Sequence, residues 1–407
     1  MLIHQLLDEV SSLNSNDIQI TLLPYSKSKY IEIYGQREDS ESFDSSKNYI
    51  VVNNEIIIFK DIYFSIFLEC HKALKIRNVD LSDDEKLKYQ YGLLLTSPGN
   101  HTLLNDHEKL VYQLISKQQQ QDVNSDLLDF EFKYVSMLLR SSISRINKSS
   151  CLWTFYEKLI VLLHHHFKYH HTDFVLRTIL QSAKMHHNNY YCWSFARFFK
   201  WFIEEIIQGV TLDEDKYFQS FYNFCTGNVF DNSSWVFLIQ LFIPSCDTEV
   251  ASFYENRYKY MVSNLREWFR MDEFKPVKTD REVDLNKAKK RFSDLIKFIE
   301  NSYCKSYIPY RCLLLLTQEP KLKNEFVKQL FDLHGGFFQS VIDFERKFKV
   351  KIVLCNGYTD FEIANENDNQ IKEELKRDVL FIEGLKINGN KKRMLMWYDN
   401  FYINSQV

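Results

Sequence analysis

The chain has 407 residues, 45% of them hydrophobic, with 51 basic and 54 acidic residues and a net charge of −3. This length supports a large buried core and more than one domain. The near balance of charge excludes a bulk attraction to nucleic acid or to an anionic membrane, so any such partner requires a local patch.

Glycine, proline and cysteine restrict the fold and the compartment. The 10 glycines and 6 prolines compare with about 28 and about 20 for average composition, which argues against a turn-rich β architecture. The eight cysteines are scattered and form no CxxC pair, as expected for reduced thiols. No apolar run approaches the roughly 20 residues of a membrane span. We therefore expect a cytoplasmic protein that binds no metal through its cysteines.

In chain order, residues 1–60 show no helical period and are predicted to be irregular, with Glu55 to Phe59 as their candidate extended run. Residues 61–330 are predicted to form helical repeats. The residue pattern changes again after about residue 330. There the β-branched run Lys349 to Cys355 before Asn356-Gly357 suggests a strand. The predicted domains are therefore 1–60, 61–330 and a C-terminal extension at 331–407.

The central segment contains a tryptophan period. Trp153, Trp193 and Trp235 are separated by 193−153 = 40 and 235−193 = 42 residues. Each follows an Asn/Ser-rich corner of the kind that caps a helix start, and each opens apolar spacings of three and four. These tryptophans could be stacking platforms, but their repeat spacing favours inter-helix core. The predicted unit is helix, corner, helix, and stacked units form a solenoid.

Two weaker copies flank the set, with Leu104 and Tyr310 at the tryptophan position. The first gap, 153−104 = 49, includes the glutamine run 118–121, which we interpret as an inserted loop. The last gap, 310−235 = 75, exceeds one period. A charge-dense stretch around residues 271–290 is predicted to interrupt the array there.

Two clusters have competing interpretations. His166 and His170 stand four apart, as helical metal ligands can, but the residues between them include no glutamate, and a solvated helix end is favoured. The basic run Lys391 to Arg393 could touch an anionic surface, but a charged loop end is favoured. Neither cluster is predicted to bind metal.

The run Asn189-Tyr190-Tyr191-Cys192-Trp193 reproduces Asn-Tyr-x-x-Trp, and in this it resembles the repeats of protein prenyltransferase α subunits. The resemblance covers roughly residues 90 to 315, and Leu104 and Ala196 depart from the family pattern. It assigns to the repeat motif and partner interface Asn100, His101, Trp153, Asn189, Tyr190, Tyr191, Trp193, Arg197, Asn232, Trp235, Tyr307 and Tyr310.

The resemblance implies an all-α fold, a right-handed αα superhelix, that wraps a β subunit of the Rab geranylgeranyltransferase type. It implies the α subunit of a third-type geranylgeranyltransferase, which transfers an isoprenoid to a cysteine of a SNARE-like acceptor that already carries a lipid. Zinc and geranylgeranyl diphosphate are expected on the partner, and this chain itself is expected to bind no cofactor. The alternative is a non-catalytic helical scaffold derived from the same family.

Lys148 is the predicted catalytic residue. It lies five positions before Trp153, where the family places a lysine that faces the isoprenoid diphosphate, and a cation there stabilises charge on the leaving group. The competing interpretation is a solvated lysine at a helix corner. Ser150, where the family has tyrosine, departs from the pattern of that contact.

Overall fold

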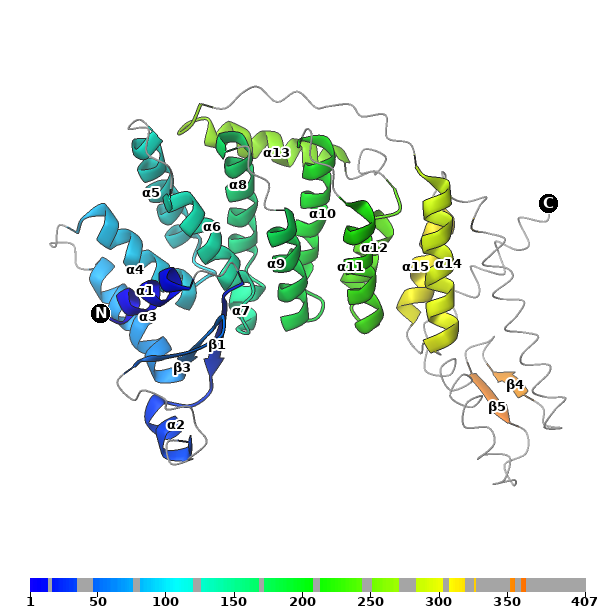
Figure 1. Ribbon diagram of the computed structural model, residues 1–407, viewed down its shortest axis with the longest axis horizontal. Helices are drawn as coiled ribbons and strands as arrows, with labels where there is room; N and C mark the ends of the chain where they lie inside the picture. Colours follow the sequence, from blue (N-terminus) through cyan, green and yellow to red (C-terminus); the bar gives the residue numbers. More distant parts are fainter. Residues whose placement is uncertain are drawn as a thin grey trace. The chain divides into compact units, whose positions relative to one another are not determined.

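The computed structural model describes residues 1–13, 17–34, 47–75, 81–119, 126–167, 172–207, 213–243, 251–270, 283–302, 307–318, 326, 352–355 and 360–363. It is predominantly helical (Figure 1), which confirms the predicted all-α class. The chain forms two compact units: unit 1 is Met1–Leu212 with Ser245–Thr279, and unit 2 is Asp213–Pro244 with Asp280–Val407. The domain boundaries at residues 60 and 330 and the right-handed superhelix remain predictions.

Unit 1 begins with a small α/β module. Helix α1 (Leu2–Ser12) is followed by β1 (Gln19–Leu23), α2 (Lys27–Tyr34), β2 (Tyr49–Val52) and β3 (Glu55–Phe59). The strand order is β1-β3-β2, with β1 parallel and β2 antiparallel to β3. Ile20, Ile56 and Ile58 are fully buried on one face of this sheet. The extended run expected at Glu55 to Phe59 is confirmed as the central strand.

The rest of unit 1 is built from helices joined at corners. After α3 (Lys60–Lys75) come α4 (Asp83–Thr96) and α5 (His101–Gln119), then α6 (Asp126–Leu139), the short α7 (Ser144–Asn147) and α8 (Ser150–Phe167), and then α9 (Thr172–Met185) and α10 (Tyr190–Glu205). The predicted sequence of helix, corner and helix is therefore confirmed around Trp153 and Trp193. Their side chains are 2% and 0% exposed, which confirms that they belong to the core.

A buried arginine ties the N-terminal module to these helices. The Arg140 side chain is 0% exposed, and its Nη1 donates to Asp17 Oδ1 at 3.3 Å and to Gln181 Oε1 at 3.1 Å. The amide of Ser142 donates to the carbonyl of Ile20 in β1 at 3.1 Å. Both contacts fix the corner between α6 and α8 against the sheet.

Helix α13 (Ala251–Leu265) returns to unit 1 and packs on α8 and α10 (Figure 1). Tyr254 and Tyr258 contact the rings of Phe198, Trp201 and Phe202. These rings belong to the later turns of α10, away from its start at Tyr190. The start of α10 is therefore remote from the α13 contact.

Unit 2 contains α11 (Glu214–Gly227), α12 (Asn232–Gln240), α14 (Leu285–Ser302), α15 (Tyr307–Gln318) and the antiparallel pair β4 (Ile352–Cys355) and β5 (Asp360–Ile363). Strand β4 confirms the predicted strand over its last four residues. Trp235 is 1% exposed and, as predicted, is core.

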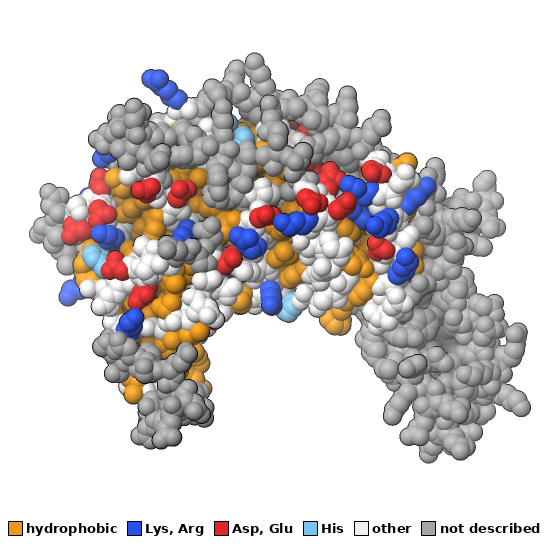
Figure 2. All heavy atoms as spheres, viewed as in Figure 1, with side chains coloured by type: hydrophobic (Ala, Val, Ile, Leu, Met, Phe, Trp, Pro, Cys, Tyr) orange, Lys and Arg blue, Asp and Glu red, His pale blue; other side chains and the backbone are white. Residues whose placement is uncertain are grey.

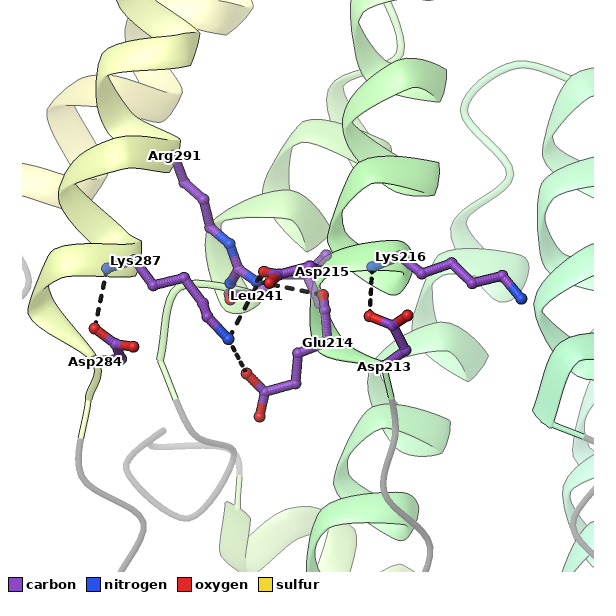
Figure 3. A network of polar contacts seen from close by, with 8 residues as sticks. All are labelled: Asp213, Glu214, Asp215, Lys216, Leu241, Asp284, Lys287 and Arg291. Carbon is purple, nitrogen blue, oxygen red and sulfur yellow. Dashed lines mark hydrogen bonds and ion pairs between the residues drawn. The ribbon is translucent and has the colours of Figure 1, made fainter.

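Arg291 of α14 lies within a network of polar contacts in unit 2 (Figure 3). Its guanidinium donates to the carbonyl of Leu241 at 3.0 Å and to Asp215 Oδ1 at 3.1 Å, and it lies over the ring of Phe218. Burial lowers the pKa of Arg291, with the carboxylate of Asp215 opposing the shift. This side chain therefore holds α14 against α11 and the end of α12.

Several predicted features lie outside the described residues. These are most of the interruption at 271–290, residues 120–121 of the glutamine run, the His170 side of the histidine pair and the basic run 391–393. They remain predictions.

Candidate binding surface at the helix corners of unit 1

Three corners of unit 1 collect most of the predicted site residues. The first joins α4 to α5 (residues 97–100), the second joins α6 to α8 through α7 (140–149), and the third joins α9 to α10 (186–189). In Figure 1 the second and third corners lie at the lower ends of α8 and α10. The N-termini of α5, α8 and α10 therefore lie at the first, second and third corners, respectively.

Each corner supplies a side chain that caps the helix after it. Asn100 Oδ1 accepts from the amide of Leu103 at 3.1 Å, and Ser149 Oγ accepts from the amide of Leu152 at 3.4 Å. Asn189 Oδ1 accepts from the amide of Cys192 at 3.3 Å. A cap satisfies amides that the helix itself leaves unpaired. The Asn/Ser-rich composition of the corners thus has a local structural cause.

Two buried asparagines join the second and third corners. Asn189 Nδ2 donates to Asn147 Oδ1 at 2.6 Å, and both residues are 0% exposed. Asn147 Nδ2 donates to the carbonyl of Leu139 at 2.7 Å and to Ser182 Oγ at 2.9 Å. The carbonyl of Asn147 also accepts from the indole of Trp153 at 2.8 Å. The corner thereby acquires a fixed conformation.

The first and second corners are joined separately. Ser149 Oγ donates to the carbonyl of Pro98 at 2.9 Å. Cys151 Sγ lies 3.4 Å from Nδ1 of His101, the first residue of α5. Together with the asparagine pair, these contacts form a ladder that joins the first corner to the second and the second to the third.

The surface above this ladder carries the ammonium group of Lys148 and exposed aromatic rings. Lys148 Nζ donates to the carbonyl of His187 at 3.0 Å, across the second and third corners. Burial lowers the pKa of the neighbouring His186, and the charge of Lys148 lowers it further. Tyr190 and Tyr191 are 62% and 40% exposed, with ring centroids 5.6 Å apart. We call the surface formed by the residues listed next the corner face: His101, Lys148, His186, His187, Tyr190 and Tyr191.

The chain segments that build the corner face are poor in acidic residues, and Asp106 of α5 is the first to follow them in sequence. Residues 97–105, 141–151 and 184–191 include Arg145, Lys148 and Lys184 but no Asp or Glu. On the face drawn in Figure 2, by contrast, most Lys and Arg side chains stand beside an Asp or Glu. The positive ends of three helix dipoles add to the cationic character of the corner face. This arrangement can hold an anionic group.

The remaining predicted residues lie later in α10 or belong to elements of unit 2. Arg197 lies two turns into α10; burial raises the pKa of Tyr254 of α13, and the charge of Arg197 opposes that larger effect. In unit 2, Asp231 caps α12, Asn232 is its first residue, and Tyr307 and Tyr310 stand in the first turn of α15. The site assignments for these residues remain predictions.

Sequence reasoning missed Asn147. It opens the corner segment before Trp153 and stands 42 positions before Asn189, one repeat apart, and that match is the signal that could have identified it. Its side chain bonds to Asn189 of the third corner and also to Leu139 of α6 and Ser182 of α9.

Within the described ranges, no three His, Cys, Asp or Glu residues are arranged to hold a metal ion. None of the helices described combines the length and the apolar character that crossing a membrane requires.

Comparison with known proteins identifies a different family from the one expected. Residues 1–140 match the ECM9 N-terminal domain and residues 152–265 match the ECM9 middle domain. Protein ECM9 of Saccharomyces cerevisiae (strain ATCC 204508 / S288c) is 34% identical over 280 residues, which cover 65% of this chain and 67% of that protein.

These matches correct the expected prenyltransferase family. The assignments that depended on it are corrected with it: the geranylgeranyltransferase activity, the β-subunit partner, the lipidated acceptor and the scaffold derived from that family. The expectation that zinc and geranylgeranyl diphosphate lie on a partner remains untested. The motif does not identify the prenyltransferase family, because any array of helical hairpins needs capped helix starts and large buried side chains between its helices. An asparagine cap followed by a buried tryptophan meets both needs. The chain belongs to the ECM9 family.

Proposed function

We propose that this chain is a peptide-binding protein whose corner face recognises an acidic segment of a partner protein. The observation that carries the proposal is the set of chain segments 97–105, 141–151 and 184–191, which converge at three helix starts and contain cations but no acidic residue. The chain as a whole is acidic, with a net charge of −3. The local basic character is therefore not a consequence of composition.

The chemistry of the corner face fits carboxylates better than apolar ligands. Lys148 is a charged donor, and charge-assisted hydrogen bonds to carboxylates are among the stronger polar contacts. Tyr190 and Tyr191 offer rigid rings with hydroxyl groups, a combination that is enriched at protein interfaces. Lys148 remains the central residue of the site, but as a binding cation and not as a catalytic group.

The ladder under the corner face favours binding because it fixes the surface in advance. Asn147 and Asn189 are fully buried and hydrogen-bonded to each other, so the backbone around Lys148 and Tyr190 is held from below. A preorganised surface loses less conformational entropy when a ligand binds. We expect the affinity to fall as salt rises, because the contacts are charged and exposed.

We also propose a cytoplasmic location. The described cysteines Cys70, Cys151, Cys192, Cys225 and Cys312 are all free thiols, as is usual in a reducing compartment.

Titration with a fluorescein-labelled peptide of eight glutamates tests the proposed function by fluorescence anisotropy. Lys148→Glu should weaken binding by about tenfold or more, which corresponds to ~1.4 kcal/mol. The matched control is Lys259→Glu, because Lys259 is an exposed lysine of α13, remote from the corners. We expect this control to bind within about twofold of wild type.

Two results would contradict the proposal. One is binding of a peptide of eight lysines as tight as that of the glutamate peptide, since the corner face should repel it. The other is equal loss of affinity in Lys148→Glu and Lys259→Glu, which would show only the effect of net charge.

A further inference from the structure

Helix α3 presents an exposed stripe that the proposed function does not use. At about 100° per residue, the exposed positions of α3 fall within an arc of about 120°. Phe64 and Leu68, one turn apart in the middle of this stripe, are 54% and 64% exposed. The α3 stripe consists of Lys60, Asp61, Phe64, Leu68, His71, Lys72 and Lys75.

The α3 stripe is apolar in its middle and basic at both ends. Lys60 stands at one end and Lys72 and Lys75 at the other. The one acidic residue, Asp61, already accepts a hydrogen bond from the amide of Lys27 at 3.0 Å. Long lysine side chains can lie along an apolar surface while their ammonium groups reach outward.

A second exposed aromatic residue lies beside the Lys60 end. The amide of Lys60 donates to the carbonyl of Tyr25 at 3.1 Å, and Tyr25 is 38% exposed. The ammonium of Lys29 lies 5.6 Å from the centre of the Tyr25 ring. The mixture of aromatic and basic side chains therefore continues beyond α3, and Figure 2 shows apolar side chains at the surface over this N-terminal module.

The core of unit 1 does not need the α3 stripe. The opposite side of α3 is buried through Tyr63, Ile66 and Cys70, and it packs on α4, α1 and β3. Exposed Phe and Leu side chains in adjacent turns therefore have no role in folding that the structure shows.

Charge decides which occupant fits. In a two-fold antiparallel pair of α3 helices, Lys60 of one copy would meet Lys75 of the other, and like charges repel. A second copy of this chain is therefore disfavoured. The stripe is also the outer side of a helix and forms a ridge, whereas docking of a partner helix uses a groove. An anionic bilayer offers negative headgroups for the lysines and an apolar layer for the two side chains between them.

We infer that the α3 stripe binds the surface of a membrane that contains anionic lipid. Phe64 and Leu68 enter the boundary between headgroups and acyl chains, and Lys60, Lys72 and Lys75 contact the headgroups. The helix lies in the plane of the interface without crossing the bilayer. Tyr25 and Lys29 stand at its edge, where tyrosine and lysine are favoured.

Co-sedimentation of the full chain with vesicles tests the inference. The vesicles are pure phosphatidylcholine, or phosphatidylcholine with about 30% phosphatidylserine, and we expect at least about fivefold more binding to the second kind. Phe64→Ser/Leu68→Ser and, separately, Lys72→Glu/Lys75→Glu should each reduce binding to the anionic vesicles by about tenfold. All four positions are exposed, so the melting temperature should stay near that of wild type.

The matched control is Phe253→Ser/Tyr260→Ser on α13, whose side chains are 56% and 67% exposed. This control and Lys148→Glu should both bind the vesicles as wild type does, so the result is independent of the corner face. Failure of the wild-type chain to prefer anionic vesicles would overturn the inference. Equal loss of vesicle binding in the α13 control would overturn the inference too. Undiminished vesicle binding by the α3 variants would also overturn it, and the occupant of the α3 stripe would then be a protein.

Discussion

Asn147→Ala tests the ladder that fixes the corner face. The substitution removes the donor that serves the carbonyl of Leu139 and Ser182, at 2.7 and 2.9 Å, and the acceptor that serves Asn189 Nδ2 at 2.6 Å. All these groups are buried, and water cannot replace the missing partner without rearrangement. An unsatisfied buried polar group costs about 1–3 kcal/mol. Asn189 Nδ2 keeps the backbone carbonyl of residue 147 at 3.2 Å, so two acceptors, the Leu139 carbonyl and Ser182 Oγ, lose this donor and unit 1 should lose roughly 2–5 kcal/mol.

Thermal unfolding followed by circular dichroism measures this loss. For a unit of this size, 1 kcal/mol lowers the melting temperature by about 2–4 °C, so a shift of roughly 4–20 °C is expected. Asn105→Ala is the control, because Asn105 is an exposed asparagine of α5, and it should melt near the wild-type temperature. If Asn147→Ala melts with the control, the ladder does not stabilise the corners and our account of their rigidity fails.

Three further perturbations follow from the same structure. Trp193→Ala should cost roughly 3–5 kcal/mol, whereas Tyr190→Ala, on an exposed ring, should cost little; urea unfolding compares them. Arg291→Ala should destabilise unit 2 by about 1–3 kcal/mol, since the buried Leu241 carbonyl loses its donor while the exposed Asp215 can turn to water; an unchanged rate of limited proteolysis would contradict this. Burial raises the pKa of Glu157 to about 8, although the nearby positive charge of Arg257 lowers it. The folded state therefore holds a proton that the unfolded state releases, so this group's contribution to stability falls as pH rises from about 5 to 8; Glu157→Gln should flatten that fall, and an unchanged pH profile of the melting temperature would refute it.

The sequence predicted the features of the fold that depend on neighbouring residues. A capping asparagine before a helix and apolar spacings of three and four residues are local, and they located the corners before Trp153, Trp193 and Trp235. Burial of these indoles follows from the repeat itself, because a helical hairpin cannot cover its apolar side alone.

The features that depend on distant pairing could not be predicted in the same way. Strand β1 is hydrogen-bonded to β3, 36 residues later, and the apolar run of β3 is visible in the sequence while its partner is not. The return of α13 to pack on α8 and α10 leaves no local signal either. Both arrangements are decided by which apolar surfaces remain uncovered after the helices pack.

The candidate site was predictable in part. Lys148, Asn189 and Tyr190 were chosen because of the motif, and the structure does place them at adjoining corners. The function that the motif suggested was wrong. The motif indicates where helices are capped and where large side chains pack, and it carries no information about catalysis. The absence of acidic residues around the corners was readable in the sequence, but its meaning depended on knowing that three distant segments meet.

Hydrogen–deuterium exchange of the full chain, with and without the peptide of eight glutamates, tests the binding claim most directly because it locates the bound peptide. We predict slower exchange of amides in the first turns of α8 and α10, around Cys151 and Tyr191, with no change in α13 and loss of the effect in Lys148→Glu. Protection confined to other helices, or none at peptide concentrations that saturate the anisotropy signal, would show that the corner face is not the binding surface.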